Sequence, residues 1–541
     1  SYSSKTGRHS DTTTYSGTTV PTVGSTTNST GVVSTDIDAN ATTVTDQASK
    51  VRRSLTNALG QLIRVDEPNS SNQLGTVSSP NQATNYTYNT LGKMVRVEQG
   101  SQNRYFMYDS LGRTLRIRQP EQEVNTALNT SGDPYNNSWT AGFTFDDNGN
   151  VLITTDARGT TITSTYDALN RPLTRTYSDG TPTVTNTYDD SSIAHSKGKL
   201  TKVTSSVSET QYSGFDLVGR LTESKQVTDG TTYTSGYQYN LSGALTQETY
   251  PSGRVVTNDF DANGDISRIQ GKATSASAVH NYATNFTYFA DGKIATLRLG
   301  NGLYEGASLN SRLQVAELRL GIVTGGSSLL KLKYEYGELQ SDGSTVDATK
   351  NAGNIAKQTV TFDGLANPFV QTYKYDPLDR ITEAKETVSG SQTWIQNWGY
   401  DQYGNRTAFT QNILGSTGVS LPSIDAGSNR YAASQGYAFD KNGNVTTDPE
   451  SGGRSFTFNG DNKQTQVKDS NNYTIGSYSY DGNAKRVKKV TDLETTVFVY
   501  DGFDKLVAEY STATPPSNPT INYTATDQLG SPRVLTDAFG S

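Results

Sequence analysis

The chain has 541 residues, a formal net charge of −7 and a hydrophobic content of only 32%, a figure that includes 32 Tyr. It contains no Cys, so it has neither disulfides nor thiolate metal sites. We expect no nucleic-acid partner, because there is no dense Lys/Arg tract, and no membrane span, because no run reaches about 18 apolar residues. The low net charge and 9% aromatic content argue against disorder and predict an ordered β protein with a thin core.

The first segment, residues 1–45, is rich in Ser and Thr and poor in charge. We interpret it as an N-terminal cap or an irregular first repeat. Because the chain starts at Ser1 without Met or a signal-like apolar run, we expect a processed or trimmed piece of a secreted protein. An open sheet exposes strand edges that pair with other chains unless they are covered, and this segment is one candidate cover.

One repeated pattern dominates residues 46–526. It reads aromatic, any residue, aromatic, Asp or Asn, two residues, Gly, then Arg, Lys or Asn, as in residues 86–93 (YTYNTLGK) and 105–113 (YFMYDSLGR). The aromatic before the acidic residue recurs about every 20 residues, for example 20 from Tyr88 to Tyr108 and 22 from Tyr166 to Tyr188. The repeat aromatics are Tyr86, Tyr88, Tyr108, Phe145, Tyr166, Tyr188, Phe215, Tyr239, Phe260, Tyr288, Tyr375, Tyr400, Phe439, Phe458, Tyr480 and Tyr500.

Each repeat predicts a β-hairpin. Side chains at positions i and i+2 lie on one face of a strand, so the paired aromatics share a face. Asp and Asn start turns by bonding to the backbone two residues on, and Gly adopts the positive φ at the end of the turn. The predicted turn-capping residues are Asp109, Gly112, Asp146, Gly149, Asp167, Asp216, Gly219, Asp376, Asp401, Gly404, Asp440 and Gly443. Neighbouring hairpins are expected to pair edge to edge, because a single hairpin is unstable in water.

Three places depart from the pattern. The gaps of 37 residues between Tyr108 and Phe145 and of 39 between Tyr400 and Phe439 each indicate an insertion or a degenerate copy. Phe289 and Gly337 stand where Asp is expected. Residues 307–320 are ambiguous between helix and strand.

These residues resemble the RHS-repeat, or YD-repeat, family. A second marker of the family is residues 527–540 (DQLGSPRVLTDAFG), similar to the segment that opens the RHS core-associated region, with Gln528 in place of the usual His. Its characteristic residues here are Asp527, Gly530, Pro532 and Arg533. The resemblance implies an all-β fold in which hairpins form a long spiralling antiparallel sheet closed into a hollow shell or tube. It divides the chain into 1–45, the repeat shell 46–526 and the start of the core-associated segment, 527–541.

The resemblance also implies a function. Relatives include cocoon components of insecticidal toxin complexes, bacterial polymorphic toxins and animal teneurins, and in the toxins the shell encloses a C-terminal toxic segment released by an aspartyl motif of the form DPxGL. The Asp-Pro pairs of this chain, which begin at Asp133, Asp376 and Asp448, lack the residues that follow in that motif. No catalytic residue is therefore transferred. We expect a non-catalytic, secreted or cell-surface shell without cofactor or metal, with an enclosed polypeptide as partner.

Other interpretations stay open at this point. The tyrosines could form a surface for sugars or peptides instead of ladders that stabilise the sheet, and the aspartates could be catalytic instead of turn caps. Residues 259–270 (DFDANGDISRIQ) match part of a calcium loop, but Gln270 cannot supply the bidentate carboxylate at position 12. Residues His9, His195 and His280 are expected to be solvated in loops. Trp394 and Trp398 are expected either to pack in the core or to bind a partner.

Rival folds and functions follow from the same repeat. Two 20-residue units together approach the length of a β-propeller blade, about 40–45 residues. A structural fibre or adhesin without cargo, self-associating through its strand edges, is the main alternative function. A carbohydrate-active β-solenoid enzyme is a third, and it would require a groove with clustered carboxylates.

Overall fold

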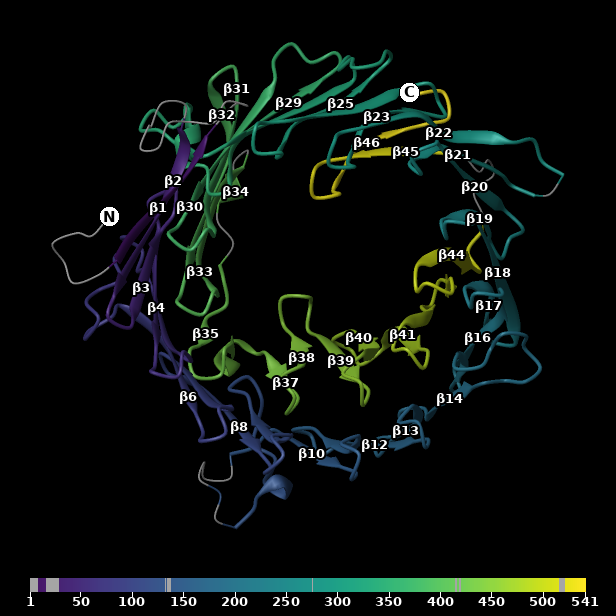
Figure 1. Ribbon diagram of the computed structural model, residues 1–541, viewed down its shortest axis with the longest axis horizontal. Coiled ribbons are helices and arrows are strands. Elements are labelled where there is room, and N and C mark those ends of the chain that lie inside the picture. Colours follow the sequence, from purple (N-terminus) through teal and green to yellow (C-terminus); the bar gives the residue numbers. More distant parts are fainter. Residues whose placement is uncertain are drawn as a thin grey trace. The chain divides into compact units, whose positions relative to one another are not determined.

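The computed structural model describes residues 8–15, 29–131, 133, 138–274, 276–413, 416–417, 420–514 and 521–541 (Figure 1). The fold is all-β, and the strands form long antiparallel ladders of successive hairpins, as predicted. The chain divides into two compact units. Unit 1 comprises Ser1–Gln102, Ala283–Ile424 and Thr520–Ser541, and unit 2 comprises Asn103–Tyr282 and Asp425–Pro519. Residues 1–7 and 16–28 of the predicted N-terminal cap lie outside the described residues.

Unit 1 contains two antiparallel ladders. The first joins β1(Arg8–Tyr15), β2(Ser29–Asp38), β3(Ala41–Thr45), β4(Val51–Thr56), β5(Leu62–Glu67), β6(Gln82–Tyr88) and β7(Met94–Gln99). The second joins β22(His280–Tyr288), β23(Ile294–Leu299), β24(Tyr304–Leu309), β25(Val315–Gly321), β26(Leu330–Tyr336), β29(Ile355–Phe362), β30(Phe369–Tyr375), β31(Ile381–Val388), β32(Ser391–Tyr400), β33(Arg406–Ile413) and β34(Ser416–Thr417). Two small pairs accompany them, β27(Glu338–Leu339) with β28(Val346–Asp347) and β45(Tyr523–Thr526) with β46(Pro532–Thr536).

Unit 2 also contains two ladders. The longer joins β8(Gln102–Tyr108), β9(Thr114–Arg118), β10(Ala141–Phe145), β11(Val151–Thr155), β12(Thr161–Tyr166), β13(Pro172–Tyr177), β14(Val184–Tyr188), β15(Leu200–Thr204), β16(Ser208–Phe215), β17(Leu221–Thr228), β18(Thr231–Tyr239), β19(Leu245–Thr249), β20(Val255–Phe260) and β21(Ile266–Lys272). The shorter joins β37(Ala438–Phe439), β38(Val445–Asp448), β39(Arg454–Phe458), β40(Gln464–Lys468), β41(Thr474–Tyr480), β42(Arg486–Val490), β43(Thr495–Tyr500) and β44(Leu506–Ser511). The pair β35(Ile424–Asp425) and β36(Arg430–Tyr431) precedes it.

The described residues include only three short 3₁₀ turns besides the strands, at Thr126–Leu128, Ala348–Lys350 and Ala433–Gln435. The window 307–320 is resolved as two strands, β24 and β25, joined by a turn at Asn310. Its helix-like spacing arose because Leu313 occupies the left-handed turn position, with φ 59°, where other repeats have Gly. At Phe289 the turn closes through backbone bonds to Lys293 and Gly292, without a side-chain acceptor.

The two long gaps have different structures. Between Tyr108 and Phe145, strand β9 pairs directly with β10, so the intervening residues, which include the first 3₁₀ turn, are an insertion. Between Tyr400 and Phe439 the chain completes one more hairpin, β32 with β33, and the strands among the described residues that follow, up to β37, have two residues each.

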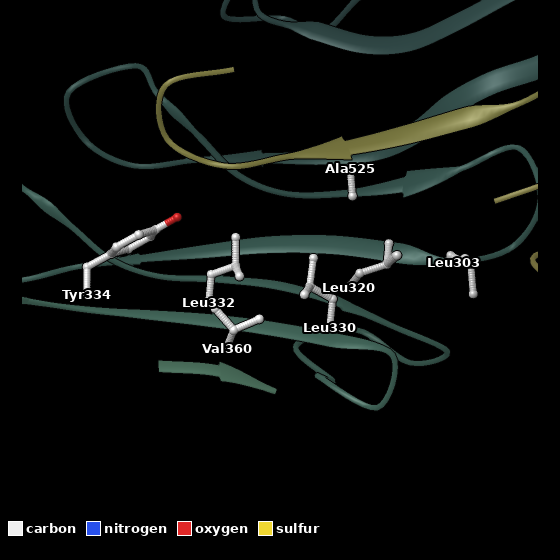
Figure 2. Packing of buried hydrophobic residues seen from close by; sticks show 7 residues of the cluster. All are labelled: Leu303, Leu320, Leu330, Leu332, Tyr334, Val360 and Ala525. Carbon is white, nitrogen blue, oxygen red and sulfur yellow. The ribbon is translucent and has the colours of Figure 1, made fainter. Parts of the chain in front are cut away.

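An apolar cluster of buried residues lies in unit 1, where the C-terminal hairpin β45–β46 covers the sheet. Its members are Leu303, Leu320, Leu330, Leu332, Tyr334, Val360 and Ala525. Figure 2 shows Ala525, on β45, opposite the leucines of β25 and β26. Seven residues make a small core for a unit of this size, as the composition predicted. Burial of such side chains contributes about 1.5–3 kcal/mol each.

In unit 2 the shorter ladder packs on the longer one. Gln226 on β17 is 3% exposed, and its side chain donates to the carbonyl of Phe498 (2.9 Å) and accepts from the N–H of Tyr500 (3.0 Å) on β43. Tyr237 on β18 accepts from the N–H of Gly502 (2.7 Å). The two layers are therefore joined by fully bonded buried polar groups as well as by apolar contacts.

The hairpin turn offers a test of the backbone geometry. Gly149 has φ 90°, and the space that a Cβ would occupy is empty. Gly149→Ala should therefore lower the free energy of unfolding by about 1–2 kcal/mol through left-handed strain alone. Gly149→Asn should cost less, because Asn170, Asn462 and Asn472 occupy the same turn position with φ between 57° and 66°. Urea unfolding of the three proteins measures this, and equal midpoints would contradict it.

Candidate functional site: the turn row of the repeat and the C-terminal hairpin

The repeat aromatics end strands. Every aromatic that precedes the acidic residue is the last residue of its strand, and Tyr86 lies two residues before the end of β6. The strand-final aromatics are Tyr88, Tyr108, Phe145, Tyr166, Tyr188, Phe215, Tyr239, Phe260, Tyr288, Tyr375, Tyr400, Phe439, Phe458, Tyr480 and Tyr500. All of them are half-buried, so each ring has one packed face and one accessible part.

The strand-final tyrosines bond backward to the preceding hairpin. The Tyr239 hydroxyl donates to the carbonyl of Leu221 (2.8 Å), the first residue of the return strand β17. The same bond, at 2.6–3.1 Å and always to the first residue of a return strand, is made by Tyr88, Tyr166, Tyr188, Tyr375, Tyr400, Tyr480 and Tyr500. This regularity makes each tyrosine a tie between consecutive hairpins.

The basic residue at the end of the turn contacts the next hairpin along the chain. Arg220 donates from Nε to Oδ2 of Asp216 (2.6 Å) and from Nη1 to the carbonyl of Asn240 in the next turn (3.0 Å). Its guanidinium lies 4.7 Å from the ring centre of Tyr239, within cation–π range. The same stacking on the next aromatic is made by Arg113, Arg171, Arg380 and Lys485.

The turn aspartates bond to their own turn. In the turn at Asp109, the N–H of Gly112 donates to the Asp109 carbonyl (3.0 Å), and carboxylate Oδ1 accepts from the N–H groups of Leu111 (3.0 Å) and Arg113 (2.9 Å). Oδ1 accepts the N–H four residues on in the same way at Asp146, Asp167, Asp216, Asp376, Asp401 and Asp440. The φ angle lies between 77° and 91° at Gly112, Gly149, Gly219, Gly404 and Gly443.

These bonds perturb the carboxylates. The hydrogen bond from the backbone N–H of Arg113 holds the pKa of Asp109 below its ordinary value, and the amide of Asn150 does the same for the pKa of Asp146. A carboxylate committed to its own turn is a poor general acid. The geometry therefore offers no acid/base pair at these positions.

The C-terminal hairpin uses the same turn. Asp527 is 7% exposed and accepts from the N–H groups of Leu529 and Ser531 (both 2.9 Å), and Gly530 has φ 82°. Pro532 begins β46. Nη2 of Arg533 donates to Oδ2 of Asp527 (2.7 Å). This arginine follows the turn aspartate by six residues, whereas in the ordinary repeat the arginine follows it by four.

The tip of this hairpin contacts the sheet of unit 1. The hydroxyl of Tyr336 lies 2.9 Å from Oε1 of Gln528, the residue that replaces the usual His. This polar contact adds to the apolar cluster around Ala525.

The remaining sequence candidates are dispersed. Asp259 pairs with Arg268 (2.6 Å) and Asp261 caps its own turn, so the calcium-like segment is a repeat hairpin. Among the described residues, no group of three His, Asp or Glu side chains is arranged to hold a metal ion. The described segments also contain no helix long and apolar enough to cross a membrane.

Two of the three histidines that were expected in loops lie in strands instead. His9 lies in β1, between Asp11 (2.9 Å) and Asp36 (2.7 Å), and these carboxylates raise its pKa. His280 lies in β22. Trp394 and Trp398 are half-buried on β32.

Comparisons with known proteins point to one family. Residues 145–182 match the family model described as RHS Repeat. The chain is 26% identical over 273 residues to the tRNA nuclease WapA of Bacillus subtilis (strain 168), which covers 50% of this chain and 10% of WapA. It is 25% identical over 258 residues to the tRNA3(Ser)-specific nuclease WapA of Bacillus spizizenii, and this match covers 47% of this chain and 10% of that nuclease.

Solved structures share the fold. The TcdB2-TccC3 structure without hypervariable C-terminal region superimposes with a TM-score of 0.76 at 14% identity, covering 94% of this chain and 29% of that chain. The Photorhabdus luminescens Tc holotoxin pore superimposes with a TM-score of 0.76 at 14% identity, and the match covers 94% of this chain and 28% of that chain. The TcdB2-TccC3-Cdc42 structure superimposes with a TM-score of 0.76 at 15% identity, and the match covers 98% of this chain and 30% of that chain. The chain thus spans about a tenth of the curated relatives and under a third of the solved chains.

The chain therefore contains an RHS repeat at residues 145–182 and shares the fold of the TcdB2-TccC3 structures. This confirms the resemblance inferred from the sequence.

The backward tie can be tested at one tyrosine. Tyr239→Phe removes the hydroxyl that bonds to the carbonyl of Leu221 and leaves that carbonyl without this donor. We expect the free energy of unfolding to fall by about 0.5–1.5 kcal/mol. Tyr233→Phe is the control, because the Tyr233 ring stacks on Tyr510 and its hydroxyl makes no hydrogen bond to a described residue. Equal urea midpoints for the two variants would show that the tie contributes nothing.

Acid should weaken the turns. Because the pKa of Asp146 is lowered in the folded protein, the folded state binds fewer protons there than the unfolded chain. The stabilisation is complete above the ordinary value of about 3.9 and is lost as the pH falls through the native pKa. Thermal melting from pH 6 to about 2 should show a falling midpoint, and Asp146→Asn should flatten that fall. Asp147→Asn, next along the turn, is the matched control, and an equal pH slope for the two variants would refute this assignment.

Proposed function

We propose that this chain is part of a non-catalytic RHS-repeat shell, secreted or at the cell surface, that encloses and delivers a C-terminal toxic polypeptide. One observation carries the proposal. The fold matches, over 94% of this chain, a structure solved without a hypervariable C-terminal region, a description that separates a constant body from a variable end.

The contacts between hairpins support this function. Where the repeat is complete, a tyrosine bonds the hairpin to the one before it and a basic residue contacts the one after it, so the sheet can be extended by repetition. Such nearest-neighbour stability does not require a thick core. A thin wall with polar groups on both faces suits a structure that meets water outside and a polypeptide inside.

We place the toxic activity outside residues 1–541. The curated relatives are named as nucleases of tRNA, but the matched region is a tenth of their length. The carboxylates of the repeat cap turns and provide no catalytic pair. The proposal is therefore that this chain supplies the wall and another part of the polypeptide supplies the toxin.

Limited proteolysis of the natural polypeptide that contains this sequence, followed by mass spectrometry, tests the proposal. We expect a C-terminal fragment that stays associated with the repeat region and resists protease. After urea unfolds the sheet, the same fragment should be digested within the normal time course. The absence of both a longer precursor and an associated fragment would overturn the proposal.

Electron microscopy of the same preparation addresses the alternative function. Closed particles with internal density are expected. Filaments with chains joined end to end would instead indicate a surface fibre without cargo.

A further inference from the structure

Unit 2 contains a polar cavity of about 350 Å³ between its two ladders. One wall is the β13–β14 connection, residues 179–184, and the other is formed by the ends of β39 and β41 with their turns. Two hydrogen bonds hold the walls together. The N–H of Gly460 donates to Oγ1 of Thr181 (2.8 Å), and the hydroxyl of Tyr177 donates to Oδ2 of Asp461 (2.9 Å).

The cavity is acidic. Asp179, Asp461 and Asp481 line it, and none of its lining residues is Lys, Arg or His. Arg175 lies behind the wall, where it donates to the carbonyl of Gly482 (2.8 Å). Two further arginines contact lining residues from outside the cavity: Arg158 donates to the carbonyl of Asn459 (3.0 Å), and Arg486 lies over the ring of Tyr478. Because the charged side chains of the lining itself are all carboxylates, the cavity attracts positively charged groups.

Of the three carboxylates, Asp481 is the one whose burial and hydrogen bonds favour binding of a cation. It is only 8% exposed, and its Oδ1 accepts from the N–H groups of Asn483 (2.9 Å) and Lys485 (2.8 Å). Oδ2 accepts no hydrogen bond from a described residue, and no described Lys, Arg or His nitrogen lies within 4.0 Å of this carboxylate. Lys485, which holds the position of the arginine in other repeats, pairs with Asp504 instead. Burial raises the pKa of Asp481, although the backbone N–H bonds and the charge of Lys485 oppose this shift.

Two of the three aromatic rings that line the cavity, those of Phe458 and Tyr480, also lack a cation over their faces, whereas Arg486 lies over the third, Tyr478 (5.5 Å to the ring centre). Elsewhere the basic residue of one turn covers the next aromatic, as Arg220 covers Tyr239. Before Phe458 that position is Asn444, whose amide bonds to a turn aspartate. In the described part of the chain no Lys or Arg lies over the rings of Phe458 or Tyr480, and both rings line the cavity.

We propose that this cavity binds the side chain of an arginine or lysine from an extended basic polypeptide. The cation would lie between the Asp481 carboxylate and the rings of Phe458 and Tyr480, as the protein's own arginines lie between turn carboxylates and aromatic rings. A neutral sugar could use the hydroxyls and rings but not the uncompensated charge. This inference stands independently of the proposed function.

Saturation-transfer NMR and calorimetry with a Gly-flanked single-Arg peptide test the inference, with the same peptide carrying citrulline as the neutral control. We expect the wild-type chain to bind the Arg peptide about tenfold more tightly than the citrulline peptide, and the affinity to fall as salt rises. Asp481→Asn should remove most of that preference while keeping the turn, because Asn caps the equivalent turn at Asn240 and Asn459.

Asp469→Asn is the matched control. Asp469 caps the turn between β40 and β41 with the same two backbone bonds but does not line the cavity. Its variant should bind the Arg peptide like the wild type. If Asp481→Asn fails to fold by circular dichroism, Asp461→Asn takes its place. The inference would be overturned if the wild type bound the Arg and citrulline peptides equally, or if both variants lost the preference for Arg to the same extent. Displacement of the Arg peptide by neutral maltohexaose would also overturn it.

Discussion

The instability of a single hairpin in water is the constraint on which this structure depends. Each hairpin must be held by its neighbours, and the repeat motif supplies both attachments within a few residues. The strand-final Tyr239 bonds backward to Leu221, while Arg220 stacks on Tyr239 and bonds forward to Asn240. Stability is therefore distributed along the ladder and does not depend on one central core.

Variation within the motif follows from this arrangement. Where Asn replaces the final Arg, as at Asn150, Asn405 and Asn444, its amide still bonds to Oδ2 of the turn aspartate at 2.8–2.9 Å. The shorter side chain keeps the turn but does not reach the next aromatic. A repeat with Asn thus leaves a ring open, and the cavity at Phe458 is one place where that happens.

Structural and chemical roles are separated in this protein. The turn carboxylates that bond to arginines are neutralised, and they hold the sheet together. Asp481 differs from these, because Lys485, the basic residue of its turn, pairs with Asp504 instead. A local departure from the repeat thereby converts a turn cap into a charged lining of a cavity without disturbing the hairpin.

Local signals in the sequence encode the hairpins, their period and their turns. Asp109 and Gly112 predict a turn, because the hydrogen bonds of that turn lie within five residues. The strands between such turns are predicted by their alternating side chains. The turn at Phe289, which lacks the acidic residue, shows that backbone bonding is sufficient once neighbouring strands pair. The Arg side chains were visible in the pattern, but their contact with the following aromatic was not.

Which hairpins face one another depends on tertiary packing and has no local signal in the sequence. Tyr177 and Asp461 are 284 residues apart, and Gln226 and Phe498 are 272 apart, yet each pair is hydrogen bonded. No local preference encodes such separations, because they arise when the shorter ladder of unit 2 packs on the longer one. The acidic cavity exists for the same reason: its carboxylates belong to ordinary turns that become a site only when the two layers meet.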